Sequence, residues 1–164
     1  MKKKNRIIFF STIIFLIALG QLIKQIIVKN IDSSKIIIDD FFKLSFIKNT
    51  GGAFGLGNNY IWIFILLNIV IITVILIFTQ RKKELSKIEF IGYILLLSGG
   101  TGNLIDRIFR GYVVDYIDIN DFINYPVFNL EDMLIVVGIV IIMIYIIKLE
   151  RRGSVLTDPM KNNE

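Results

Sequence analysis

The sequence predicts an α-helical integral membrane protein with four transmembrane helices, and three observations carry this prediction. Hydrophobic residues make up 54% of the 164 residues, against about 45–50% in soluble domains. They gather in four stretches, at about residues 7–28, 60–79, 90–105 and 133–149, and about 20 apolar residues are needed to cross the hydrocarbon core. Most Lys and Arg residues flank these stretches, as they do at the ends of membrane helices.

The first predicted span follows a cluster of four basic residues. A secretory signal peptide also combines a basic segment with an apolar core, but this apolar stretch is longer than usual and no small-x-small cleavage site follows it. We therefore expect an uncleaved span at residues 7–28, in which Lys24 can snorkel toward the membrane surface. The basic residues before the span are Lys2, Lys3, Lys4 and Arg6.

A polar segment of mixed charge, residues 30–59, precedes the second span. Polar and apolar residues alternate at 43–47, which is a weak strand signal. Four glycines between Gly51 and Gly57 disfavour a regular helix. The second span then begins at Tyr60, an aromatic residue of the kind that anchors helices at the membrane surface.

Small residues at 98–102 interrupt the apolar character of the third span near its end. They are typical either of a break in the helix or of a face that packs closely against another helix. The fourth span has its apolar core at residues 134–147. We expect residues 1–150 to form a single four-span domain, followed by a polar cytoplasmic tail at 151–164.

The charge distribution predicts how the spans are oriented. Lys and Arg are concentrated before the first span, in the loop at 81–87 and after the fourth span, which are therefore expected to be cytoplasmic. The loop at 106–131 has two basic and five acidic residues and is expected on the other side. Topology thus accounts for the net charge of +5, and no nucleic acid partner is expected.

The absence of Cys and His restricts the chemistry available to this chain. It excludes disulfides, thiol nucleophiles, His-assisted serine triads and the usual zinc sites. We therefore expect no metal and no cofactor. If the protein is a hydrolase, its acid and base must be carboxylates, Lys or Tyr.

Polar residues gather at the expected outer ends of the third and fourth spans. Asn103, Asp106 and Arg107 fall at the end of the third apolar stretch, where an ionisable residue costs about 2.5–3.5 kcal/mol on insertion scales. Such residues are usually paired or functional, so a structural ion pair and a role in a site are both open for Asp106 and Arg107.

Asp132 allows two interpretations. It falls in the first turn of the fourth helix, with Asn129 as a plausible N-cap, and a carboxylate there gains about 0.3–1 kcal/mol from the helix dipole. Spacing alone favours this capping role. The functional interpretation pairs Asp132 with Asp115, so that the two carboxyls share one proton, one activating water and the other donating to a substrate carbonyl.

Three motifs, taken together, resemble those of lipoprotein signal peptidase (signal peptidase II), the intramembrane aspartyl protease of bacteria. Their order and their positions relative to the spans are specific, and the resemblance covers roughly residues 41–138 together with the four-span plan. The motifs are Lys-Asn-Thr-Gly-Gly-Ala-Phe-Gly at 48–55, Gly-Asn-Leu-Ile-Asp-Arg at 102–107 with Gly-Tyr-Val-Val-Asp-Tyr at 111–116, and Phe-Asn-Leu-Glu-Asp at 128–132.

The resemblance implies an activity and a set of site residues. The implied substrates are prolipoproteins that carry a diacylglyceryl group on Cys, cut just before that Cys in the bacterial cytoplasmic membrane, with membrane lipids as further partners. The site is expected at the extracytoplasmic face, with a small β-like cradle and a mobile loop between the first two spans. The implied catalytic pair is Asp115 and Asp132, and the residues implied to line or brace the site are Asn49, Asn103, Asp106, Arg107 and Asn129.

The sequence departs from the pattern of this family at three places. Gly20 replaces the Asp of a usual Asp-Gln-x-x-Lys motif in the first span, and Gly100-Thr101 replaces Ala and an apolar residue. Glu131 occupies a position where a small residue is usual. We expect Glu131 either to make Asp132 harder to ionise or to point away from it.

Two other functions stay open. Polar residues and glycines in a span also fit a small transporter, although the ionisable residues here cluster at one membrane face rather than at mid-depth. Gly20 and Glu131 leave room for a non-catalytic relative that binds lipidated peptides without cutting them. A Ser–Lys peptidase built on Ser34 and Lys35 is disfavoured, because neighbours in sequence do not usually face each other.

Overall fold

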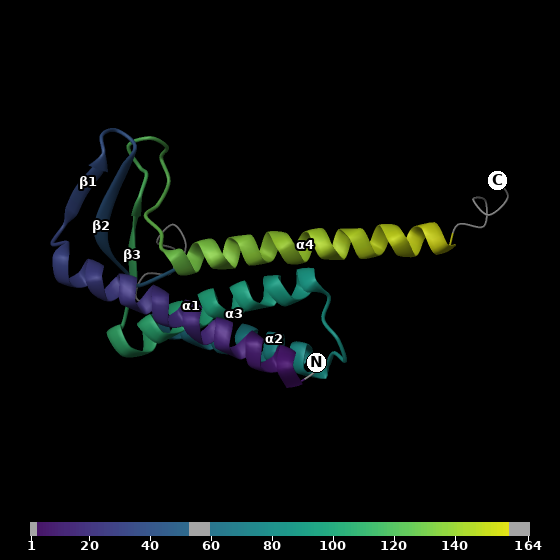
Figure 1. The fold of residues 1–164 in the computed structure, drawn as a ribbon. Helices are drawn as coiled ribbons and strands as arrows, with labels where there is room; N and C mark the ends of the chain where they lie inside the picture. Colours follow the sequence, from purple (N-terminus) through teal and green to yellow (C-terminus); the bar gives the residue numbers. More distant parts are fainter. Residues whose placement is uncertain (1–2, 53–59, 158–164) are drawn as a thin grey trace.

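The structure is a computed structural model that describes residues 3–52 and 60–157, and the side chains of these residues as far as Glu150. Within these residues, four helices are long and apolar enough to cross a membrane. The structure also contains a small three-stranded sheet (Figure 1). This confirms the predicted fold class. The elements in chain order are α1 Lys3–Asn30, β1 Ser34–Ile38, β2 Phe42–Asn49, α2 Ile61–Arg81, α3 Lys87–Arg110, β3 Val113–Asp118 and α4 Leu130–Thr157.

Helix α3 is the centre of the bundle, because it packs against α1, α2 and α4. Its small residues make this possible. A Cβ on Gly99 would lie 2.4 Å from the backbone oxygen of Glu131 on α4, so only Gly allows the two helices to approach this closely. The helix is continuous through residues 98–102, and these residues are therefore a packing face rather than a break.

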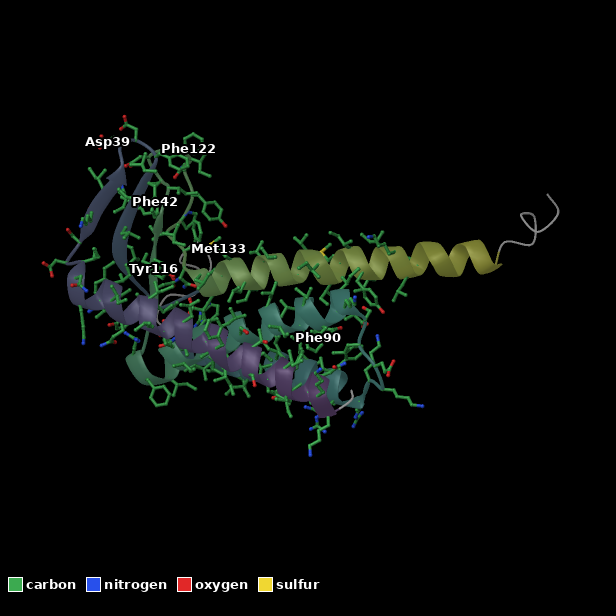
Figure 2. All side chains as sticks on the ribbon, in the orientation of Figure 1. Asp39, Phe42, Phe90, Tyr116, Phe122 and Met133 are labelled. Atoms are coloured by element: carbon green, nitrogen blue, oxygen red, sulfur yellow. The ribbon has the colours of Figure 1, made fainter. Side chains whose placement is uncertain are left out.

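The sheet has the order β1-β2-β3 and is antiparallel throughout. It stands at one end of the bundle, beside the end of α1 and the start of α4, while the start of α1 and the end of α4 lie at the opposite end (Figure 1). At the end of the sheet farthest from the helices, where Figure 2 labels Asp39 and Phe122, the ring of Phe122 is in edge-to-face contact with Phe41. The sheet matters for the site because it places β3 against α3 and α1.

Two apolar clusters hold the elements in place. One joins α1 to α3 through Phe9, Ile13, Ile94 and Leu97, away from the sheet. The other fixes the sheet to the end of α1, and the largest of its buried side chains is Tyr116 of β3, which is 5% exposed. The orientation of β3 relative to the helices is thus set by buried contacts on its inner face.

The helices are longer than the predicted spans, because polar residues extend each of them past the apolar core. Helix α3 begins at Lys87, where Ser86 and Glu89 form a reciprocal capping box and Glu89 also pairs with Lys82. It ends at Arg110, where Gly111 takes a left-handed conformation with φ 75°. Helix α4 continues to Thr157, into the segment expected to be a polar tail.

The described residues between the first two spans form two strands, whereas the sequence pattern predicted one. Strand β2 covers and extends the predicted residues 43–47. Strand β1 had no alternating pattern to reveal it, since all five of its residues are exposed. Ser34 and Lys35 are successive residues of β1 and so point to opposite faces. Most of the expected loop at 51–57 lies outside the described residues.

Candidate active site

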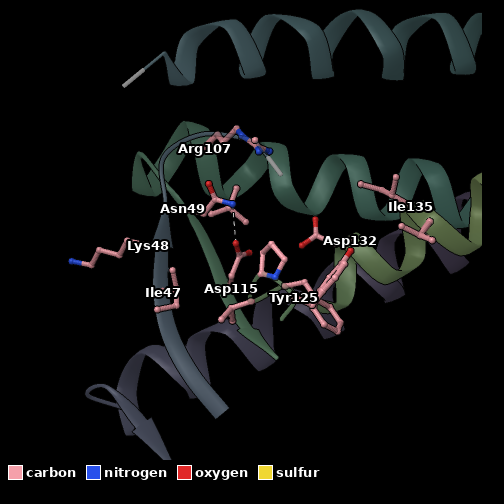
Figure 3. Close-up of a pocket in the computed structure, with 14 residues that line it drawn as sticks. Ile47, Lys48, Asn49, Arg107, Asp115, Tyr125, Asp132 and Ile135 are labelled. Atoms are coloured by element: carbon pink, nitrogen blue, oxygen red, sulfur yellow. Dashed lines mark hydrogen bonds between the residues drawn. The ribbon is translucent and has the colours of Figure 1, made fainter. Parts of the chain in front are cut away.

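Asp115 lies on β3, where only 2% of the residue is exposed. Strand pairing places it opposite Ile47 of β2, which brings the end of β2 within reach of its carboxyl. Asn49 Nδ2 donates to Asp115 Oδ2 at 2.9 Å (Figure 3), and Asn129 Nδ2 donates to Asp115 Oδ1 at 2.6 Å. The carboxyl is therefore held in one orientation from both sides.

The environment of Asp115 favours its protonated form. Burial raises its pKa to about 7, the charge of Asp132 adds to this effect, and the hydrogen bonds from Asn49 and Asn129 oppose it. A buried carboxyl beside a second carboxyl gives up its proton only at higher pH. Asp115 can therefore hold a proton near neutral pH, as a general acid must.

Asp132 lies in the first turn of α4, where it both caps the helix and accepts a hydrogen bond from α3. Its backbone N–H donates to Asn129 Oδ1 at 2.9 Å, and its Oδ2 accepts from the backbone N–H of Asn129 at 3.1 Å, which is a reciprocal capping arrangement. Its Oδ1 accepts a hydrogen bond of 2.8 Å from Asn103 Nδ2. The predicted capping role is thus confirmed, and it does not remove Asp132 from the site.

Two asparagines connect the carboxylates of Asp115 and Asp132. Asn129 contacts both, through its side chain and its backbone respectively. Asn129 Nδ2 also donates to Asn103 Oδ1 at 3.3 Å. Both asparagines are buried, so this small network fixes β3, α3 and α4 relative to one another at the point where the two carboxylates lie.

Arg107 faces the same site instead of pairing with its neighbour. Its Nη2 donates to the backbone oxygen of Gly51 at 3.2 Å, and its guanidinium stacks 5.6 Å from the ring centre of Phe64. A mutual ion pair with Asp106, one of the two possibilities left by the sequence, is not formed. Asp106 instead pairs with Lys24 and with Arg110, one helical turn further along α3.

A cavity of about 470 Å³ opens onto the two carboxylates (Figure 3). Asp115 and Asp132 both line it, together with Asn49 and Arg107. Much of the rest of the wall is apolar. These apolar residues include Ile47, Val113, Val127, Phe128, Ile135 and Val136. The cavity thus combines apolar walls with a few polar groups, as ligand sites usually do.

Lys24 is the site residue that sequence reasoning placed wrongly. The sequence allowed it to snorkel to the membrane surface, but it is fully buried and lies between Asp106 and Glu131. Asp106 also accepts a hydrogen bond from the backbone N–H of Val114 at 3.1 Å, so the charged cluster braces β3 from behind. The Lys24 ammonium reaches the site itself through Asn103 Oδ1, at 3.0 Å.

The predicted site residues therefore fall into three groups. Asp115, Asp132, Asn49 and Arg107 line the cavity. Asn103 and Asn129 connect the carboxylates, and Asp106 lies behind them in the charged cluster. Sequence reasoning missed Gln21, which donates to Asp106 Oδ1 at 3.2 Å. Gln21 is three residues before Lys24, and this spacing places both side chains on one face of the helix. That spacing could have indicated that Gln21 belongs to the same cluster.

Comparisons with known proteins agree with this geometry. The family model described as signal peptidase (SPase) II matches residues 12–148. Lipoprotein signal peptidases from Streptococcus agalactiae serotypes Ia and III are each 38% identical to this chain over 152 residues, which cover 92% of this chain and 98% of the relative. These matches favour the peptidase over the transporter.

Two solved structures share the fold, and both are described as bacterial membrane enzymes determined by the in meso method. The one at 2.3 Å resolution gives a TM-score of 0.80 at 26% identity and covers 95% of this chain and 92% of its own. The one at 1.9 Å resolution gives 0.76 at 29% identity, with 85% and 92% covered. With four helices long and apolar enough to span a membrane, a family match over residues 12–148 and these structural neighbours, the chain belongs to the signal peptidase II family, the aspartic proteases that remove signal peptides from lipoprotein precursors.

Proposed function

We propose that Asp115 and Asp132 are the catalytic pair of this peptidase and that they hydrolyse the peptide bond just before a lipid-modified Cys. One observation carries this proposal. Two carboxylates from different elements line one cavity and are tied together by the hydrogen bonds of Asn129. Paired carboxylates held in this way can divide the work of acid and base between them.

The environments of the two carboxylates assign their roles. Asp132 lies in the first turn of α4, where the helix dipole favours a negative charge, and it accepts hydrogen bonds from Asn103 Nδ2 and from the backbone of Asn129. It takes a proton from water, whose oxygen attacks the scissile carbonyl carbon. Asp115, whose pKa is raised to about 7 by burial, donates its proton to the carbonyl oxygen. Asp132 then gives its proton to the amide nitrogen, the C–N bond breaks, and Asp115 takes a proton from a hydroxyl of the diol, which restores both groups and leaves a carboxylic acid and an amine.

The remaining site residues hold the pair and the substrate in place. Asn49 and Asn129 fix the orientation of the Asp115 carboxyl, while Asn103 fixes Asp132. Arg107 lines the cavity beside the carboxylates, where its remaining N–H groups can reach a substrate backbone oxygen. Such fixed donors contribute to catalysis because they need no reorganisation during the reaction.

The lipid on the substrate explains why the site lies at the ends of membrane helices. Each buried CH₂ contributes about 0.8 kcal/mol to membrane binding, so a diacylated peptide stays in the bilayer while it is cut. The cavity wall includes Ile135 and Val136 of α4, which lie one turn along a membrane helix from Asp132. An apolar signal peptide entering from the membrane meets these residues before it reaches the carboxylates.

We further propose that the site faces the extracytoplasmic side of a bacterial cytoplasmic membrane, with both termini in the cytoplasm. The basic loop between α2 and α3 supports this orientation. Because the chain contains no Cys, single introduced thiols give an unambiguous test. In intact cells, an impermeant maleimide is expected to label Asn120→Cys and not Glu84→Cys, both of which are exposed positions. The reverse pattern would overturn the orientation.

The activity is tested with two versions of one substrate. Purified protein in detergent is expected to release the signal peptide from a diacylglyceryl-modified prolipoprotein and to leave the unmodified precursor largely intact. Mass spectrometry of the products should place the cut just before the modified Cys. If folded protein binds the modified precursor without cutting it, the non-catalytic interpretation is correct and the proposal fails.

The pKa of Asp115 gives a pH prediction. The acid must carry its proton, and the pKa of Asp115 is raised by burial to about 7, so its protonated fraction falls as pH increases through that value. We expect kcat to decrease above about pH 7, approaching tenfold per pH unit. Measuring kcat from pH 5 to 9, with the melting temperature recorded at each pH, checks this. A rate that rises steadily across this range would contradict the assigned roles.

A further inference from the structure

Lys24 forms the centre of a buried charged cluster that the catalytic proposal does not use. Its Nζ lies 2.8 Å from Asp106 Oδ2 and 3.1 Å from Glu131 Oε1, and it donates a hydrogen bond of 3.0 Å to Asn103 Oδ1. The contact with Glu131 is an ion pair without hydrogen-bond geometry, since neither carboxylate oxygen of Glu131 has a hydrogen-bond partner among the described residues. Within the described part of the chain, Lys24 is the only cation paired with Glu131.

Glu131 reaches Lys24 through a slot between two glycines. A Cβ on Gly20 of α1 would lie 2.5 Å from Glu131 Oε1, and a Cβ on Gly102 of α3 would lie 2.6 Å from Glu131 Cγ. Both distances are too short for real side chains. Any side chain at position 20 would therefore occupy the space that the Glu131 carboxylate now fills.

The cluster is balanced in charge, with two cations facing two carboxylates. Asp106 is shared between Lys24 and Arg110, whose Nε lies 3.1 Å from Asp106 Oδ1, whereas Glu131 is paired with Lys24 alone. Lys24, Asp106 and Glu131 are at most 1% exposed. Because a buried charge without its partner is costly, the fold needs one carboxylate in the slot beside Lys24.

A short path of hydrogen bonds connects the cluster to the proposed catalytic pair. Lys24 donates to Asn103 Oδ1, and Asn103 Nδ2 donates to Asp132 Oδ1 at 2.8 Å. The ammonium thereby fixes which end of the Asn103 amide faces Asp132. Asn129 Nδ2, which holds Asp115, also donates to Asn103 Oδ1 at 3.3 Å. If Lys24 moves, the orientation of Asn103 and both carboxylates is affected.

We propose that Glu131 is a positioning residue, because its carboxylate fills the slot between Gly20 and Gly102 and holds Lys24, which orients Asn103 toward Asp132. The inference rests on the proposed function of Asp115 and Asp132. Gly20 and Glu131 depend on each other, because the small residue on α1 makes room for the long side chain on α4. An Asp at position 20 would stand one turn before Lys24, at a spacing that favours pairing along a helix.

The proposal predicts that an Asp at position 20 can take over the role of the Glu131 carboxylate. Glu131→Ala is expected to lower kcat by about 10-fold to 100-fold with little change in KM, since small misplacements of catalytic groups have effects of this order. Gly20→Asp alone is also expected to lower kcat, because its side chain displaces the Glu131 carboxylate. The double variant Gly20→Asp/Glu131→Ala is expected to recover most of the wild-type kcat and melting temperature.

The assay uses the full chain in detergent with the diacylglyceryl-modified precursor, and the exposed residue Glu84 provides a control, Glu84→Ala. Recovery in the double variant supports the exchange, and it supports it equally when Glu131→Ala alone does not fold. A double variant as slow and as unstable as Glu131→Ala, or a Glu131→Ala variant with wild-type kcat, overturns it. Wild-type cleavage and its loss in Asp115→Asn report separately on the proposed function.

Discussion

Replacing either Asp115 or Asp132 with Asn is expected to reduce the rate of signal-peptide release by at least about 100-fold, because general acid–base groups typically contribute 10²–10⁴-fold. Asn has nearly the same shape as Asp but cannot exchange a proton. Asp115→Asn removes the proton donor, and Asp132→Asn removes the group that activates water. Both variants keep an oxygen that can accept a hydrogen bond, so the contacts with Asn49, Asn103 and Asn129 are partly retained.

A matched control for these variants is Asp121→Asn. Asp121 follows β3 and its side chain is 50% exposed, with its carboxylate 2.9 Å from Lys43 Nζ. It lies outside the residues that line the cavity, so its replacement is expected to leave the rate within about twofold of wild type, as for an exposed ion pair of small energetic value. A large loss of rate in this control would show that the removal of any acidic side chain near the sheet slows cleavage, so that the losses at Asp115 and Asp132 would not be specific.

Replacing Lys24 with Met is expected to have the largest effect on stability. The change leaves the buried carboxylate of Glu131 without its cation and Asp106 with one cation fewer. Breaking a buried ion pair from one side costs about 3–5 kcal/mol. For a chain of this size, that corresponds to a fall in melting temperature of roughly 10 °C, measured by thermal unfolding in detergent.

Two further variants show whether this loss arises from the buried charge. Lys29 is exposed in the last turn of α1, so Lys29→Met is expected to change the melting temperature little. Lys24→Met/Glu131→Met removes both charges and is expected to recover part of the lost stability, because an apolar replacement of a whole buried pair is often neutral. A melting temperature for Lys24→Met within about 2 °C of wild type would contradict the buried cluster.

The four helices could be predicted from sequence because membrane spans are set by length and apolar composition, which are local properties. The absence of His and Cys directed attention to carboxylates, but the choice of Asp115 and Asp132 came from the resemblance of the motifs, because spacing alone favoured capping for Asp132. The orientation of Asn129 also followed from a local rule, since N-caps are recognised by residue type and position.

Contacts between distant parts of the chain could not be predicted in the same way. Lys24 and Glu131 are separated by most of the sequence, and no local pattern indicates that they meet. The sequence offered Arg107 as a partner for Asp106, but the turn of α3 points these neighbours in different directions, and Asp106 pairs with Arg110 one turn away. Strand β1 was missed because its residues are exposed on both faces, which leaves no alternation to detect.

The central claim is that Asp115 and Asp132 act as one catalytic pair, and the kinetics of Asp115→Asn/Asp132→Asn test it most directly. The rate of signal-peptide release from the diacylglyceryl-modified precursor would be measured for this double variant, both single variants and wild type, all shown to be folded. Groups that act as a unit have strongly non-additive effects. The account predicts a double variant about as slow as the slower single variant. Losses that multiply, or a near-wild-type rate in either single variant, would contradict it.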